Sequence, residues 1–149
     1  MKSNLRYCGL LLVLMLGWLP SEAKSMAVVV DKANATSNLT AIDLIKILQA
    51  SNRKWPDGKN VTVVMRDPNS PEMQQFLQRL YKMSPDEVKT FLASHKGTFV
   101  TAESDEILIK LVESTPGAVG LVDVYSITSH INVLKVDGKL PLEQGYALH

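Results

Sequence analysis

Short apolar runs that alternate with helix start signals are the feature of this sequence that most limits its fold. Residues 28–30, 61–64 and 118–122 are largely apolar runs without a regular polar alternation, as expected of strands covered on both faces. Further strands are expected at residues 132–136 and 146–148. Strands separated by helices favour a sheet with helices packed on its faces. We therefore predict one α/β layer structure with a mixed, mostly parallel sheet of four or five strands.

Four helices are indicated by residues that commonly begin helices. Ser70 and Ser84 are each followed by proline, which is the arrangement of an N-cap and a first helical residue. Apolar side chains after Ser70 repeat with helical spacing, namely Met73, Phe76, Leu77, Leu80 and Tyr81. Ser104 is expected to start the last helix, and Thr40 a helix over residues 41–50 that buries Leu44, Ile45 and Leu48.

The first residues have the pattern of a secretory signal peptide. Lys2 and Arg6 give a positive start, residues 10–19 are almost continuously apolar, and the small residues Ser21 and Ala23 fit a cleavage site. The apolar run is shorter than the roughly 20 residues that a spanning helix needs. We predict that the first 23 residues are removed after Ala23 and that the protein is periplasmic or secreted. A short anchor that stays uncleaved is the alternative.

The part that follows, residues 24–149, is predicted to be one domain. The only cysteine is Cys8, which lies within the predicted signal peptide, so the mature chain has no disulfide. Without Lys2, Arg6 and Glu22, the 16 basic and 15 acidic side chains become 14 of each. A balanced charge argues against a nucleic-acid partner, which would need a basic excess, and no membrane span is expected after cleavage.

Residue patterns of enzymes and metal sites do not occur in this sequence. The three histidines share no metal-ligand spacing, and there is no phosphate loop or nucleophile elbow. The carboxylate pairs Asp86-Glu87 and Asp105-Glu106 are interpreted as helix-start residues, which the helix dipole favours. We predict a non-enzymatic protein without a catalytic residue, cofactor or metal.

One segment has the residue types of an anion site. Arg66 ends a predicted strand and Ser70 caps the helix that follows, where the amides of Glu72 and Met73 would be unpaired. Arginine adds a planar, always-charged fork that suits phosphate, sulfate or carboxylate. The alternative from the residues alone is that Ser70 only caps the helix and that Arg66 pairs with Asp67 or Glu72.

Several stretches in order resemble the substrate-binding proteins of phosphate ABC transporters, which have the type II periplasmic binding protein fold. The first stretch runs from Leu39-Thr40 to Ile47 and on to the turn Trp55-Pro56-Asp57-Gly58. The strand to Arg66, followed by Ser70 and Phe76, is the second. The others are residues 116–120 (Pro-Gly-Ala-Val-Gly), 133–138 and 145–148. Together they extend over residues 26–148, nearly all of the mature chain.

The resemblance implies one lobe of such a protein, with residues 27–30 and 146–148 as hinge segments side by side. Pro71 and Glu72 stand where the family has glycine and threonine, so a backbone donor is lost and a negative charge is added. The resemblance implies an exported solute-binding module for phosphate or a similar oxyanion. We predict that the monomer binds free phosphate weakly or not at all, mainly because the other lobe is missing. The alternative is a lobe that has lost its ligand and acts as a protein-interaction module, binding an envelope partner or a second copy.

Overall fold

The computed structural model describes residues 25–148. The predicted signal peptide and its cleavage after Ala23 lie outside the described residues. In chain order the elements are β1 (Met26–Asp31), β2 (Asn38–Leu39), α1 (Ala41–Leu48), β3 (Thr62–Arg66), α2 (Pro71–Tyr81), α3 (Pro85–Ser94), β4 (Phe99–Ala102), α4 (Asp105–Ser114), β5 (Ala118–Asp123), the 3-10 turn η1 (Val124–Ser126), β6 (Ile131–Val133) and β7 (Lys135–Val136). Among these helices, none is long and apolar enough to cross a membrane.

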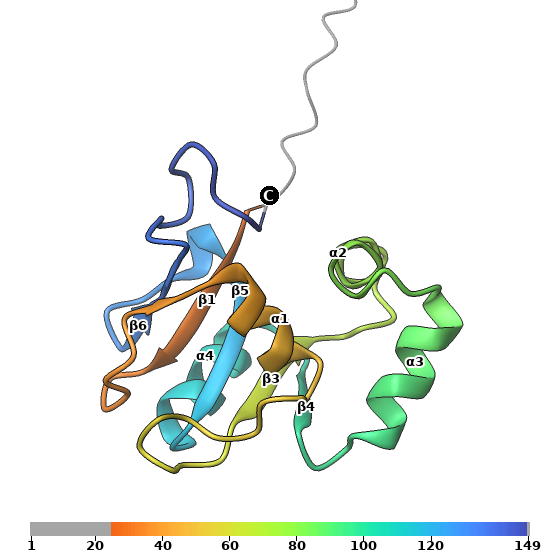
Figure 1. Cartoon of the computed structure of the whole chain (residues 1–149), viewed down its shortest axis with the longest axis horizontal. Helices are drawn as coiled ribbons and strands as arrows, with labels where there is room; N and C mark the ends of the chain where they lie inside the picture. The colour runs from red at the N-terminus through yellow and green to blue at the C-terminus, as the bar shows by residue number, and fades with distance from the viewer. Residues whose placement is uncertain (1–24, 149) are drawn as a thin grey trace, which may run out of the picture.

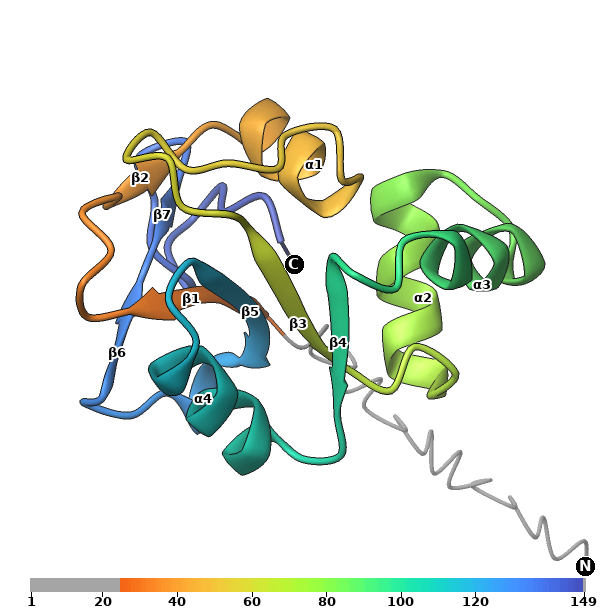
Figure 2. The same ribbon diagram turned by 90° about the horizontal axis from the view of Figure 1, so that it is seen from below.

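Five strands form the main sheet in the order β4-β3-β5-β1-β6 (Figure 2). β3 pairs in parallel with both β4 and β5, while β1 pairs antiparallel with β5 and with β6. Four strands therefore share one direction and β1 runs against them. This confirms the predicted α/β class with a mixed, mostly parallel sheet, and the three apolar runs are its central strands β1, β3 and β5. The short strands β2 and β7 form a separate parallel pair.

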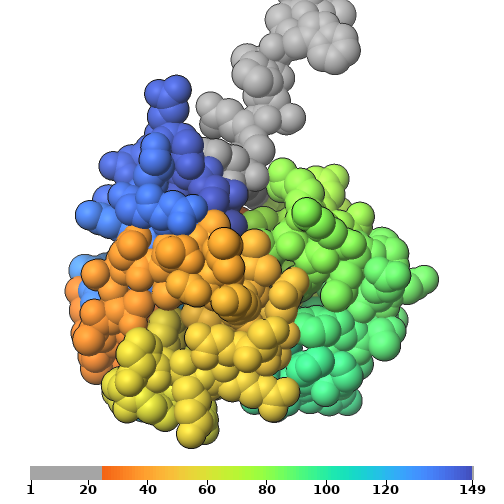
Figure 3. Space-filling model, in the orientation of Figure 1, coloured from red at the N-terminus to blue at the C-terminus, as the bar shows by residue number. Residues whose placement is uncertain are grey.

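Helices cover both faces of the sheet (Figures 1 and 2). Alternate residues of β1 point to opposite faces of the sheet. Val28 and Val30 belong to a hydrophobic cluster with buried residues of α1 and α2. Ala27 and Val29 belong to a second cluster, with buried residues of α4. In Figure 3, residues from the first part of the described chain form much of the near surface, and the α2–α3 segment lies beside them. Strands buried on both faces explain why their sequences lack polar alternation.

Helix starts follow the sequence signals closely. The side chains of Thr40, Ser70, Ser84 and Ser104 each accept a hydrogen bond from the backbone amide three residues on. Ser84 also receives the reciprocal contact, because its amide donates to the Glu87 carboxylate at 3.0 Å. These caps satisfy amides that have no partner within the helix.

Several sequence expectations need correction. Strand β4 is not among the expected strands; it is a short edge strand whose middle residues are exposed, so it lacks an apolar run. In α1 the side chain of Ile47 is buried, whereas that of Ile45 is half-buried. The strand expected at residues 132–136 is two strands, because residues 131–133 (β6) pair with β1 whereas residues 135–136 (β7) pair with β2.

The end of the described chain lies beside β1 without forming a strand. The amide of Met26 donates to the carbonyl of Leu148 at 3.2 Å, and the Tyr146 hydroxyl donates to the Met26 carbonyl at 2.8 Å. The two segments expected to be side by side are therefore adjacent, although residues 146–148 are not a ladder strand.

Two buried tyrosines should make the fold sensitive to alkali. Burial raises the pKa of Tyr81 and of Tyr146 above the ordinary value, which is about 10. Unfolded phenols then lose protons near pH 10 while folded ones keep them, so stability is present below about pH 10 and falls as the pH rises further. We expect urea unfolding at pH 8 to 11 to show this fall. It should be shallower in Tyr81→Phe/Tyr146→Phe, and equal slopes would contradict the prediction.

Candidate functional site

Arg66 lies at the carboxyl end of β3, between strands β4 and β5 that run parallel to it. In open α/β sheets this end of the strands is where ligands commonly bind. Arg66 is in register with Ala102, the last residue of β4, and α4 begins three residues later. The topology therefore brings the N-terminus of α4 to the guanidinium, in addition to the N-terminus of α2 that follows Arg66 in sequence.

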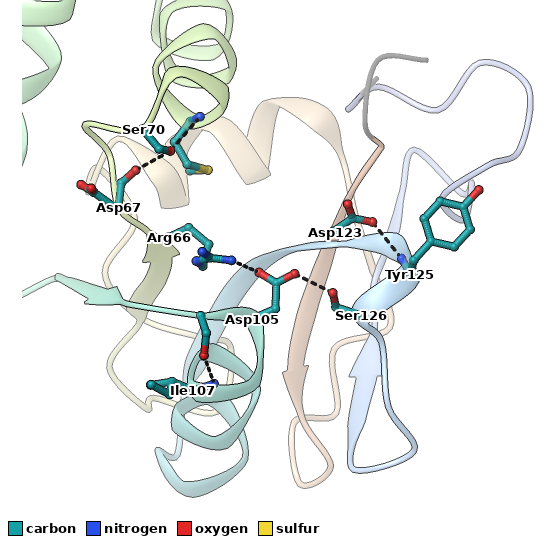
Figure 4. A network of polar contacts seen from close by, with 10 residues as sticks. Arg66, Asp67, Ser70, Asp105, Ile107, Asp123, Tyr125 and Ser126 are labelled. Carbon is teal, nitrogen blue, oxygen red and sulfur yellow. Dashed lines mark hydrogen bonds and ion pairs between the residues drawn. The ribbon is translucent and has the colours of Figure 1, made fainter. Parts of the chain in front are cut away.

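An ion pair joins Arg66 to the first residue of α4. The Arg66 Nη1 donates to Asp105 Oδ1 at 2.8 Å, and the other carboxylate oxygen, Oδ2, accepts a hydrogen bond from the Ser126 hydroxyl at 2.5 Å (Figure 4). The side chain of Arg66 is 38% exposed and that of Asp105 is 22% exposed. Both groups are partly accessible to solvent, so the ion pair contributes modestly to stability.

The guanidinium is only partly satisfied by this contact. Its Nε is buried and has no hydrogen-bond partner among residues 25–148. A buried donor without a partner is costly, and a native structure generally pairs such a group with a protein atom, a water or a ligand. The edge of Arg66 that contains Nε is therefore a place where an acceptor is needed.

Ser70, a second predicted site residue, already has two hydrogen-bond partners at the start of α2. Its hydroxyl accepts from the Met73 amide at 3.3 Å and donates to the Asp67 carbonyl at 2.8 Å (Figure 4). The Met73 amide, which the sequence predicts to face an anion, thus has a partner, and an incoming ligand would compete with the Ser70 cap. Glu72 is the exposed second residue of α2.

The 3-10 turn η1 fixes Ser126 beside Asp105. Asp123, the last residue of β5, accepts a hydrogen bond from the Tyr125 amide at 2.9 Å and so anchors the turn. The Tyr125 ring points away from the sheet and is 82% exposed (Figure 4). The turn therefore supports the polar network on one side and presents an aromatic ring on the other.

Asp105 and Ser126 are the site residues that sequence reasoning missed. The sequence indicates that Asp105 starts a helix, and the structure places it there. Asp105 is also the ion-pair partner of Arg66, a role for which the sequence suggested Asp67 or Glu72. Only recognition of β4 as the neighbour of β3 would have placed Asp105 near Arg66. Within the described range, no group of three His, Cys, Asp or Glu residues could hold a metal ion.

Comparison with known proteins finds solved structures of similar fold but no matching sequence family. No family model matches the chain, and no curated protein matches it significantly. Among solved structures, an ABC-type phosphate transport receptor from Vibrio cholerae is similar with a TM-score of 0.64 and 20% identity, covering 79% of this chain and 48% of that one. PstS from Borrelia burgdorferi is similar with a TM-score of 0.63 and 18% identity, covering 79% of this chain and 49% of that one.

A third similar structure is a putative phosphate ABC transporter substrate-binding protein with bound phosphate from Clostridium perfringens. Its TM-score is 0.62 at 18% identity, over 77% of this chain and 46% of that one. At such identities the likeness concerns the fold. The chain spans about half the length of these proteins. It therefore shares the fold of phosphate ABC transporter substrate-binding proteins in a short form that matches a single lobe.

Proposed function

We propose that this chain is an exported, non-enzymatic binding module for a small oxyanion of the phosphate type, with Arg66 as the main charge partner. The observation that carries the proposal is the Nε of Arg66, which is buried without a hydrogen-bond partner among the described residues. The fold likeness to phosphate-binding proteins supports the same ligand class. Location outside the cytoplasm rests on the predicted signal peptide.

The ligand would be held by charge and by the planar fork of arginine. A phosphate could take the place of Asp105 at Nη1 and reach the buried Nε once the Arg66 side chain shifts, and charge-assisted hydrogen bonds of this kind are the stronger ones in proteins. Pro71 removes one backbone donor at the start of α2, and the Met73 amide is held by Ser70. We therefore propose weak binding, roughly millimolar for the monomer.

Titration with inorganic phosphate at constant ionic strength near neutral pH, followed by NMR amide shifts, tests this proposal. We expect saturable shifts around Arg66 in the wild type and their loss in Arg66→Met. The matched control is Lys110→Met, which removes an exposed cation that is paired with Glu106 on α4. Equal phosphate affinity in the wild type and Arg66→Met would contradict the proposal, as would a monomer affinity in the micromolar range.

A second candidate is a protein-interaction module, for which Tyr125 is the specific observation. Tyrosine is enriched at the energetic centres of interfaces, and this ring is 82% exposed on an anchored turn. Native mass spectrometry of the exported protein would show a complex or a dimer if this role applies. Loss of that complex in Tyr125→Ser would support it.

A further inference from the structure

We propose that Asp105 is a built-in anion that competes with a ligand oxyanion for Arg66, so that the site changes between a self-paired and a ligand-bound state. This inference rests on the proposed function. Asp105 is the first residue of α4, where the helix dipole favours a negative charge, and its carboxylate contacts the guanidinium at 2.8 Å. A carboxylate in this position occupies the place that a bound anion would take.

The contact between Asp105 and Arg66 is an end-on pair. Oδ1 accepts from Nη1, whereas Oδ2 accepts from the Ser126 hydroxyl, so the carboxylate does not engage the guanidinium with both oxygens. Bidentate arginine–oxyanion pairs are stronger than single contacts of this kind. A phosphate that engages Nη1 and Nε together could therefore displace Asp105 from the guanidinium.

Ser126 and Ser104 determine how firmly Asp105 is held in the self-paired state. Ser126 lies on the η1 turn that Asp123 anchors, and Ser104 caps α4 by accepting from the Ile107 amide at 3.1 Å. Asp105 is thus fixed from the helix side and from the turn side (Figure 4). The apparent affinity for a ligand is then the intrinsic affinity multiplied by the fraction of molecules in which Arg66 is not paired with Asp105.

Removing the charge of Asp105 without changing its size tests the inference. In Asp105→Asn the amide oxygen can still accept from Arg66 and the amide nitrogen can still donate to Ser126. We expect inorganic phosphate to bind about tenfold tighter than to the wild type, because the competing charge and its repulsion are removed. Ser126→Ala, which loosens the carboxylate and keeps its charge, should give a smaller gain. Thermal melting of each variant checks that it is folded.

Glu106→Gln is the matched control, because it removes the same charge one residue further along α4. Its side chain is 78% exposed and pairs with Lys110 at 3.1 Å, so we expect less than about a twofold change in phosphate affinity. In Arg66→Met/Asp105→Asn the gain should disappear. These results together would support the inference.

Two outcomes would overturn the inference. The first leaves the proposed function intact, and the second contradicts the proposed function as well. If Asp105→Asn and Glu106→Gln bind phosphate equally, Asp105 does not compete for Arg66, while loss of binding in Arg66→Met would leave the proposed function intact. If neither the wild type nor Asp105→Asn binds phosphate in an Arg66-dependent manner, the inference and the proposed function both fail.

Discussion

Replacing Gly117 with alanine is expected to destabilise the fold by about 3 kcal/mol. A Cβ at this position would lie 2.2 Å from the carbonyl oxygen of Asn60, and the backbone φ of Gly117 is +81°. Alanine is therefore strained in conformation and also overlaps a backbone atom, which cannot move aside as a flexible side chain can. The backbone between the loop before β3 and the start of β5 would have to separate.

Gly117 also makes two contacts that such a movement would break. Its carbonyl accepts a hydrogen bond from the indole Nε1 of the buried Trp55 at 2.8 Å and from the amide of Thr62 at 3.2 Å. Both donors would lose a partner inside the protein, which is costly for buried groups. The effect of the substitution therefore extends from the turn to the junction of β3 with β5.

Substitutions at two other glycines separate the cost of backbone conformation from the cost of overlap with Asn60. Gly58 has a positive φ of +88°, whereas the φ of Gly97 is outside the left-handed region. At both positions an added Cβ would have no atom within 4 Å. We expect alanine to cost about 1 kcal/mol at Gly58, from conformation alone, and less than about 0.5 kcal/mol at Gly97. Urea unfolding measures all three variants. A loss at Gly117 no larger than at Gly58 would show that the overlap with Asn60 relaxes without cost.

The elements that the sequence predicts well are those whose signals are local. The helix starts at Ser70 and Ser84 depend on a side chain and an amide three residues apart, so they can be recognised without knowing the rest of the fold. The central strands are buried on both faces and have correspondingly apolar sequences. Strand β4 has neither signal, because it is at the edge of the sheet and its middle residues are exposed.

The candidate site could be predicted only in part for the same reason. Arg66 and Ser70 are four residues apart and follow a strand, so a sequence pattern can join them. Asp105 is 39 residues from Arg66 and Ser126 is 21 residues from Asp105. Their contacts depend on the strand order β4-β3-β5, which brings the ends of three strands together. No local pattern contains that order.

The second large effect is expected under α4, where Leu108 is fully buried. Leu108→Ala should lower the free energy of unfolding by about 2–5 kcal/mol, because it removes apolar contacts and leaves a cavity. The cavity would open above Gly120 of β5, where a Cβ would meet Leu108 Cδ2 at 2.7 Å and Val112 Cγ2 at 2.8 Å. Gly120→Ala alone is therefore overpacked and should cost about 1–3 kcal/mol.

The two substitutions should compensate each other when they are combined. The methyl group of alanine at position 120 would enter the space that Leu108 leaves, so the double variant should be more stable than the sum of the single effects by about 0.5–3 kcal/mol. Relief is incomplete because the contact with Val112 at 2.8 Å remains. Urea unfolding of the wild type, both single variants and the double variant gives this coupling energy.

Leu77→Ala supplies the control for that double-mutant cycle. Leu77 is as fully buried as Leu108, but it belongs to the cluster on the opposite face of the sheet. Its substitution should be equally destabilising and additive with Gly120→Ala to within about 0.5 kcal/mol, since the two sites share no cavity. Additivity for Leu108 as well would mean that α4 moves away from the sheet to accommodate the methyl group. Glycine at position 120 would then not be what allows α4 to pack closely on β5.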